Sequence, residues 1–156
     1  MMKIMKKILV PVDFSDTSGR LLAVAEEEAR AHGAELLLFH VIEPVAELSA
    51  FETNPQFMEM EAGPDLAAEE GVLQKRLAEL AATVQQRGLS CQSSVALGLP
   101  AHEILAAVQE HHSDCVVMGS HGHGAIFHLF TGSVVTAVLK KINCPVLVVP
   151  LRGKVK

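Results

Sequence analysis

The 156-residue sequence predicts an α/β fold, an open, doubly wound sheet of five parallel strands with helices on both faces. Short apolar runs alternate with helical patterns along the whole chain, and such alternation requires right-handed crossovers between parallel strands. Ala, Leu and Val supply 56 of the 77 apolar residues, whereas only 4% of the chain is aromatic. That composition suits a buried parallel sheet covered by closely packed helices. One domain over residues 1–156 accounts for the length, and no internal repeat is present.

The elements of the first half follow from apolar runs and helical spacing. Residues 8–12 form one apolar run, and residues 36–42 form a second. Between them we expect a helix, with Ser15 or Asp16 as its cap and Gly33 at its end. The buried face of this helix is predicted to be Leu21, Leu22, Ala25 and Ala29.

Three helices and three strands complete the alternation. Leucines at helical spacing predict a helix over residues 66–84, which Gly88 ends. Residues 115–118 are continuously apolar, as expected of a strand that is buried on both faces. The remaining elements are predicted at residues 91–97 (strand), 101–108 (helix), 134–142 (helix) and 146–149 (strand). Residues 43–64 lack a firm pattern and are interpreted as a long flexible loop, with a lid over the site as the alternative.

Charge, hydropathy and cysteine usage exclude several classes of protein. The net charge is −5, and basic residues are not interleaved with aromatic ones, so we expect no nucleic-acid partner. No uncharged apolar run is long enough to span a membrane, and the N-terminus does not fit a signal peptide. The three cysteines form no C-x-x-C pair and are interpreted as small buried hydrophobes. We therefore expect a cytoplasmic protein without a membrane partner.

The segment GSHGHGAIFHLFTGS, residues 119–133, joins the fourth strand to the last helix. Glycines let backbone amides approach an anion, and a helix start adds unpaired N–H groups and partial positive charge. The segment is not a Walker A loop, because it has no lysine, and Phe127 stands where G-x-G-x-x-G requires its third glycine. Ligands of open α/β sheets lie beyond the carboxyl ends of the strands. The loops beginning at Asp13 and Gly119 are therefore the expected site.

The same segment fits the pattern G-x(2)-G-x(9)-G-[ST], with Gly119, Gly122, Gly132 and Ser133 in its fixed positions. In this pattern the chain resembles the ATP-binding members of the universal stress protein family. The runs ILVPVDFS, HVI and CPVLVV also resemble that family, and the resemblance extends over the whole chain. It implies a Rossmann-like sheet in the order 3-2-1-4-5, and a homodimer that pairs through the fifth strand, Val146–Val149.

The resemblance further implies which residues bind the nucleotide. Asp13 would face the ribose and the adenine, and Val41 would read the adenine through its main chain. The backbone amides of Gly132, Ser133 and Val134, with the Ser133 hydroxyl, would hold the outer phosphates. The full predicted set is Pro11, Val12, Asp13, Val41, Met118, Gly119, Gly122, His123, Gly132, Ser133 and Val134.

No Lys or Arg lies in the glycine-rich segment, which instead carries His121, His123 and His128. Because the phosphates would lack a fixed cation, we expect Mg²⁺ or Mn²⁺ to accompany ATP, ADP or AMP. Histidine ordinarily titrates near pH 6.5, so we also expect affinity for the triphosphate to rise between about pH 8 and 6. Zinc binding by these histidines, or by His111 and His112 with Cys115, is less favoured because structural zinc sites combine tight ligand pairs.

The resulting functional hypothesis is an ATP-binding, nucleotide-responsive homodimer that acts as a regulator in stress response. No catalytic residue is predicted, since the sequence carries no G-x-S-x-G elbow. One alternative is a slow ATPase in which Asp13 positions a water. The other is a chaperone-like dimer that does not use nucleotide, against which the intact glycine spacing argues. His40 and His102 are isolated in the sequence and carry no signal.

Overall fold

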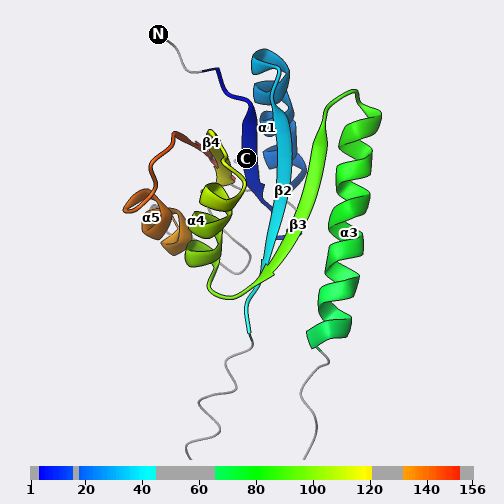
Figure 1. Cartoon of the computed structure of the whole chain (residues 1–156), viewed down its shortest axis with the longest axis vertical. Helices are drawn as coiled ribbons and strands as arrows, with labels where there is room; N and C mark the ends of the chain where they lie inside the picture. Colours follow the sequence, from blue (N-terminus) through cyan, green and yellow to red (C-terminus); the bar gives the residue numbers. More distant parts are fainter. Residues whose placement is uncertain (1–3, 16–17, 45–65, 121–131, 152–156) are drawn as a thin grey trace, which may run out of the picture.

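The structure, a computed structural model, describes residues 4–15, 18–44, 66–120 and 132–151. These residues form a five-stranded parallel sheet in the order β3-β2-β1-β4-β5, with helices on both faces (Figure 1). The strands are β1 (Lys7–Pro11), β2 (Glu35–Ile42), β3 (Cys91–Leu97), β4 (Cys115–Gly119) and β5 (Val146–Val149). The helices are α1 (Ser18–His32), α3 (Leu66–Gln86), α4 (Pro100–Glu110) and α5 (Ser133–Leu139). The predicted fold class and strand order are confirmed.

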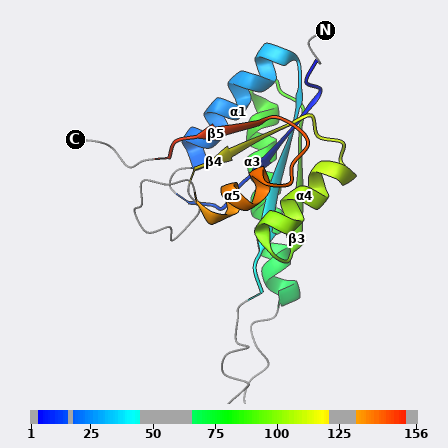
Figure 2. The same ribbon diagram turned by 90° about the vertical axis from the view of Figure 1, so that its left-hand side faces the viewer.

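Alternate residues of the central strand enter two separate cores. Ile8 and Val10 of β1 pack with α1 and α3 on one face of the sheet, whereas Leu9 packs with α4 and α5 on the other. Figure 2 shows α4 and α5 on the near side of the sheet and α3 behind it. Both faces of β1 and β4 are therefore buried, as their unbroken apolar sequences predict.

The boundaries differ from the predicted ones mainly at α5. The helix ends at Leu139 rather than at residue 142, because the Val138 carbonyl accepts hydrogen bonds from both the Lys141 and the Ile142 amides. Such a shared acceptor marks a closing turn. Helix α1 begins at Ser18, whose amide donates to the Ser15 carbonyl at 3.0 Å. The expected cap residue Asp16 and nearly all of the predicted 43–64 loop lie outside the described residues.

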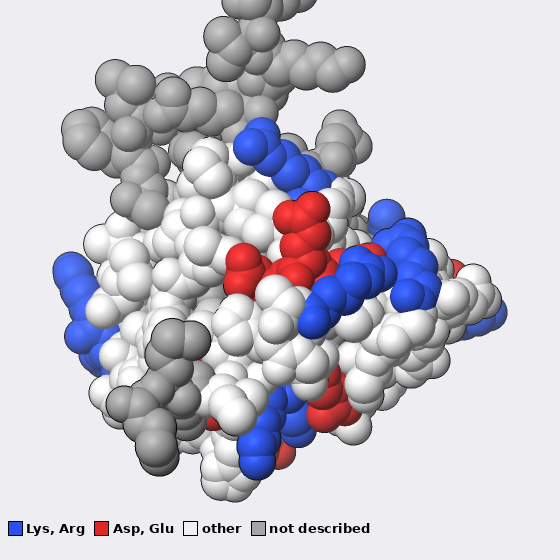
Figure 3. All heavy atoms as spheres, turned by 90° about the horizontal axis from the view of Figure 1, so that it is seen from above, with Lys and Arg blue, Asp and Glu red and all other residues white. Residues whose placement is uncertain are grey.

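The amino ends of the strands carry a face of paired charges. Glu26 of α1 is only 4% exposed and forms ion pairs with Arg30, at 3.4 Å, and with Arg87. Lys7 pairs with Glu35, at 3.7 Å. Seen from this end in Figure 3, basic and acidic side chains lie interspersed. Charges at this end are thus compensated within the chain.

Two cysteines stand at the start of strands on this same end. Burial raises the pKa of the Cys91 thiol to about 11, and the nearby Glu26 and Glu35 carboxylates add to the effect. Burial likewise raises the pKa of Cys115 to about 11. Both are buried and Cys144 is partly buried, so the interpretation of Cys91 and Cys115 as buried hydrophobes is confirmed.

Over the described ranges, no helix combines the length and the apolarity that crossing a membrane requires.

Candidate functional site

A cleft of about 550 Å³ opens at the carboxyl ends of β1, β2 and β4. That is the edge at which open α/β sheets bind ligands. Its strand-derived lining is Pro11, Val12, Asp13, Phe39, His40, Val41, Ile42, Glu43, Met118, Gly119 and Ser120. Helices and the chain after β5 add Ser18, Leu21, Glu69, Leu73, Pro100, Ile104, Gly132, Ser133, Val134, Val135 and Leu151. Apolar walls with a few polar groups are typical of small-molecule sites.

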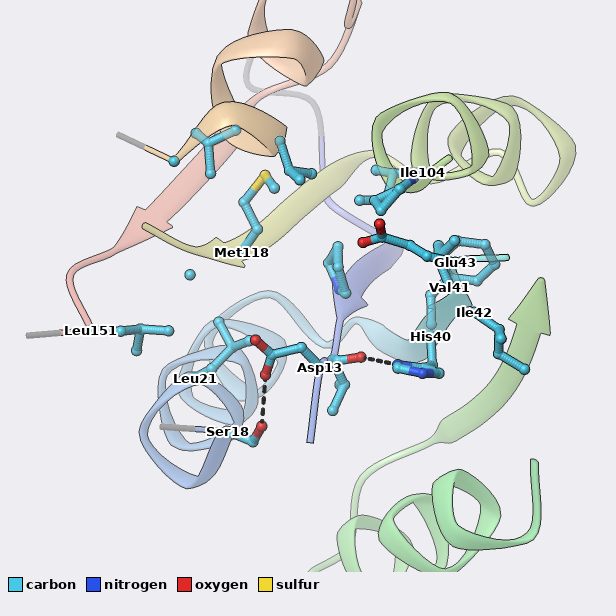
Figure 4. Close-up of a pocket in the computed structure, with 18 of the residues that line it drawn as sticks. Asp13, Ser18, Leu21, His40, Val41, Ile42, Glu43, Ile104, Met118 and Leu151 are labelled. Carbon is cyan, nitrogen blue, oxygen red and sulfur yellow. Dashed lines mark hydrogen bonds between the residues drawn. The ribbon is translucent and has the colours of Figure 1, made fainter. Parts of the chain in front are cut away.

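Asp13 is fixed at the point where β1 leaves the sheet. Its Oδ1 accepts a hydrogen bond from the Ser15 amide at 3.0 Å and lies 3.5 Å from the Ser18 hydroxyl. Figure 4 places Asp13 beside Ser18 and Leu21 of α1, and Glu43 beside Ile104 of α4. The carboxylate is therefore oriented before any ligand arrives, and it can accept hydrogen bonds from hydroxyl groups.

Strand β2 runs past the end of β1 and exposes backbone to the cleft. The last paired residues of the two strands are Pro11 and Phe39, and the Val12 amide donates to the Phe39 carbonyl at 2.8 Å. Val41 lies beyond this point. Its main chain on the side away from β3 borders the cleft, and no β1 residue pairs with it. Main-chain groups at such an edge can donate to and accept from a flat heterocycle.

Hydrogen bonds tie the two ends of the glycine-rich segment together. Ser120 is anchored to the end of β5 by two hydrogen bonds. Its amide donates to the Val149 carbonyl, and its hydroxyl oxygen accepts from the Leu151 amide. The Gly132 amide donates to the Ser120 carbonyl at 2.8 Å. Because that amide is already engaged, the part of Gly132 in binding would be to leave space. The next amides, of Ser133 and Val134, open a helix and have no intrahelical acceptor.

All charged side chains among the described lining residues are carboxylates, namely Asp13, Glu43 and Glu69. An anion in the cleft would need compensation from a bound cation or from residues outside the described ranges. Nowhere in the described part of the chain do three or more His, Cys, Asp or Glu side chains gather as metal ligands, and this includes His111, His112 and Cys115. The zinc alternative for that group therefore lacks support.

The cleft contains nine of the eleven residues predicted from the sequence, and the other two, Gly122 and His123, lie outside the described residues. Sequence reasoning missed His40, whose Nδ1 lies 2.5 Å from the Val12 carbonyl oxygen (Figure 4). Its position next to Val41, opposite the end of β1, was the available signal. Reasoning along the chain also missed Glu69 and Leu73, which only the packing of α3 brings to the cleft.

Comparison with known proteins gives consistent results over nearly the whole chain. A model of the universal stress protein family matches residues 5–150. A universal stress protein of Thermus aquaticus is 38% identical over 144 residues, which cover 92% of this chain and 98% of the relative. The solved structure of MJ0577, a universal stress protein of Methanocaldococcus jannaschii, superposes with a TM-score of 0.77 at 26% identity, covering 97% of this chain and 100% of that one.

A universal stress protein solved in complex with cAMP shares the fold, with a TM-score of 0.68 at 20% identity. The match covers 96% of this chain and 100% of that chain.

Proposed function

This chain belongs to the universal stress protein family, and from that premise we propose that its cleft binds an adenine nucleotide, ATP, ADP or AMP. The observation that carries the proposal is the gathering of nine predicted nucleotide-binding residues around one cleft. The volume of about 550 Å³ lies within the range of roughly 300–1,000 Å³ that is usual for small-molecule pockets. The universal stress protein solved in complex with cAMP, which shares this fold, also supports the proposal that the ligand is an adenine nucleotide.

In this proposal the base and the ribose lie over β1 and β2. The Asp13 carboxylate accepts hydrogen bonds from the ribose hydroxyls, and the Val41 main chain pairs with the edge of the adenine. Since the chain has no Trp and no Tyr, the faces of the base are held by aliphatic walls, of which Val12 and Met118 are part.

The phosphates lie toward Gly119 and the start of α5, where the amides of Ser133 and Val134 and the Ser133 hydroxyl are available as donors. A Mg²⁺ or Mn²⁺ ion would arrive with the nucleotide and would take most of its ligands from phosphate oxygens and water. This fits the described lining, which offers carboxylates but no cluster of three metal ligands. The ion supplies the positive charge that the cleft lacks.

The proposal also includes a homodimer that forms through β5, acting as a nucleotide-responsive regulator in stress response. Among the described strands, β5 pairs only with β4 and stands at the edge of the sheet. Leu147 on this strand is 37% exposed. A free edge with an exposed apolar side chain is suited to pairing with a second copy.

Calorimetric titration with ATP, ADP and AMP, with and without Mg²⁺, tests the binding. We expect Asp13→Asn to weaken binding about tenfold, because a charge-assisted hydrogen bond becomes a neutral one. We expect Gly132→Val to abolish binding, because Gly132 lines the cleft and a branched side chain on its wall would take space from the nucleotide. The control is Glu27→Gln, which removes one carboxylate from the exposed face of α1. A wild type that releases no heat with any nucleotide would refute the proposal.

The same samples test the ATP-hydrolysing alternative. Chromatography of the incubated mixtures would detect ADP or AMP, and turnover that disappears in Asp13→Ala would favour an enzyme. Nucleotide released from protein purified without added ligand would show which adenine nucleotide the protein selects.

A further inference from the structure

Phe14, the residue after Asp13, has an unusual backbone conformation. Its φ is 60°, in the left-handed region that bulky side chains rarely adopt. Such a conformation persists where surrounding contacts over-determine it, and it occurs often at binding sites. At Phe14 those contacts come from two other elements of the fold.

The ring of Phe14 contacts one side chain from β2 and one from α3. Its centroid lies 4.7 Å from that of the His40 ring, at an interplanar angle of 54°. The Arg76 guanidinium carbon lies 4.5 Å from the Phe14 centroid, within the range of a cation–π contact. We call Phe14, His40 and Arg76 the Phe14 stack.

The Phe14 stack holds the backbone on both sides of Asp13. On one side, His40 Nδ1 lies at hydrogen-bond distance from the Val12 carbonyl oxygen. On the other side, Phe14 is fixed by its two ring contacts and by packing against the core beneath α1. The Asp13 carboxylate thus projects from a short segment whose neighbours in the chain are both restrained.

Through Arg76 this restraint extends to α3. Glu69, Leu73 and Arg76 are spaced as residues on one face of a helix, and the first two line the cleft. Further along α3, Leu77 and Val84 are buried against the sheet. One helix therefore anchors in the core, borders the cleft and contacts Phe14.

We propose that the Phe14 stack couples nucleotide binding at Asp13 to the position of α3, with Arg76 and Phe14 as positioning residues. This inference rests on the proposed nucleotide binding. The stack favours the orientation of Asp13 that meets the ribose. Arg76 therefore raises the affinity for the nucleotide without contacting the nucleotide itself. Because such coupling is reciprocal, a bound nucleotide stabilises the first turns of α3.

The test measures nucleotide affinity and the protection of α3 in matched variants. Arg76→Ala removes the cation from the stack. Lys75→Ala removes a positive charge from the preceding position of α3, outside the stack. Both residues are exposed, so both variants are expected to fold. We expect calorimetry to show about threefold weaker ATP binding for Arg76→Ala, the size of an exposed cation–π contact, and an unchanged value for Lys75→Ala.

Phe14→Leu and Phe14→Trp separate ring stacking from simple burial. We expect Phe14→Leu to weaken ATP binding about fivefold and Phe14→Trp to keep the wild-type affinity within twofold. Since the chain has no Trp or Tyr, the indole of Phe14→Trp is also a unique fluorophore beside the cleft. Its emission is expected to change on adding ATP, and to change less when Arg76→Ala is also present.

Hydrogen exchange at saturating ATP supplies the second readout. The amides of the first turns of α3 should gain protection in the wild type and in Lys75→Ala, but not in Arg76→Ala. Equal affinity and equal protection in the two alanine variants would overturn the coupling and leave the proposed function standing. A wild type that binds none of the nucleotides would overturn both.

Discussion

At the amino ends of the strands, buried and half-buried acidic side chains meet basic partners, whereas at the carboxyl ends the charged side chains of the cleft are carboxylates. Glu26 exemplifies the first arrangement and Asp13 the second. Glu26 lies under two guanidinium groups, while Asp13 is oriented by hydrogen bonds from Ser15 and Ser18 and lines an open cleft. Paired charges at one end hold the fold together, and oriented charges at the other are available to a ligand.

The variant Glu26→Gln tests whether the ion pairs at the amino end stabilise the fold. Breaking a fully buried ion pair costs about 3–5 kcal/mol. Here the Arg30 and Arg87 side chains are 47% and 51% exposed and can regain water, so we expect a loss of about 2 kcal/mol. For a chain of this length the melting temperature would fall by roughly 4–8 °C.

Urea unfolding and nucleotide calorimetry on the same variant separate stability from binding. The exposed neighbour Glu27→Gln is the control and should change neither quantity. An affinity that falls together with stability in Glu26→Gln would contradict the separation of the two ends.

The second test uses the alkaline pH dependence of the amino-end thiols. The pKa values of Cys91 and Cys115 are raised to about 11 in the folded protein, whereas an ordinary thiol titrates near 9. Above pH 9 the unfolded chain therefore loses protons that the folded chain keeps, so the free energy of unfolding falls as pH rises. By pH 10 we expect a loss of about 1 kcal/mol per thiol.

Replacing both residues, as Cys91→Ala with Cys115→Ala, should flatten this decline between pH 8 and 10, measured by urea unfolding. Cys144→Ala serves as the comparison, because that residue is less buried. If the free energy of unfolding fell equally steeply with pH in the double variant and the wild type, the pKa values of the two thiols would not be raised by folding.

The smallest expected effect concerns the carboxyl end. We predict that ATP affinity rises about threefold from pH 8 to 6, because the glycine-rich segment carries His121 and His123, which gain positive charge as the pH falls. Calorimetry on His121→Asn with His123→Asn should show a smaller rise. The titration of ATP itself is common to both proteins, so the difference between them isolates the two substituted histidines. An unchanged pH dependence would contradict the hypothesis.

The sequence predicted the fold well because the fold depends on local patterns. Apolar runs and helical spacing identified β1, β2, β4 and the helices, and the glycine pattern with the family resemblance supplied the strand order. The end of α5 was predicted too far along the chain. The last turn depends on the backbone hydrogen bonds that the Lys141 and Ile142 amides donate to the Val138 carbonyl. The residue types at these positions do not predict those bonds.

The candidate site was predictable where its residues follow a strand directly, as Asp13 and Gly119 do. The Phe14 stack was not predictable, because Arg76 reaches Phe14 only after α3 has packed on the sheet. An exposed arginine in the middle of a helix is indistinguishable, in sequence, from any other solvated charge. His40 was missed for a related reason, since its partner, the Val12 carbonyl, lies just after the end of the neighbouring strand β1.

The central position of β1 has a consequence for the newly made chain. Ile8 pairs with Leu36 on one side and with Cys115 on the other, so β1 receives its second neighbour, β4, only after β2, α3, β3 and α4 have been synthesised. If β1, β2 and β3 pair before β4 is available, the open edge of β1 would be apolar and unpaired, and such edges promote aggregation. The cleft needs both halves of the sheet and is completed last. A nucleotide bound in this cleft, as we propose, would therefore stabilise the finished protein and would not assist the early stages of its folding.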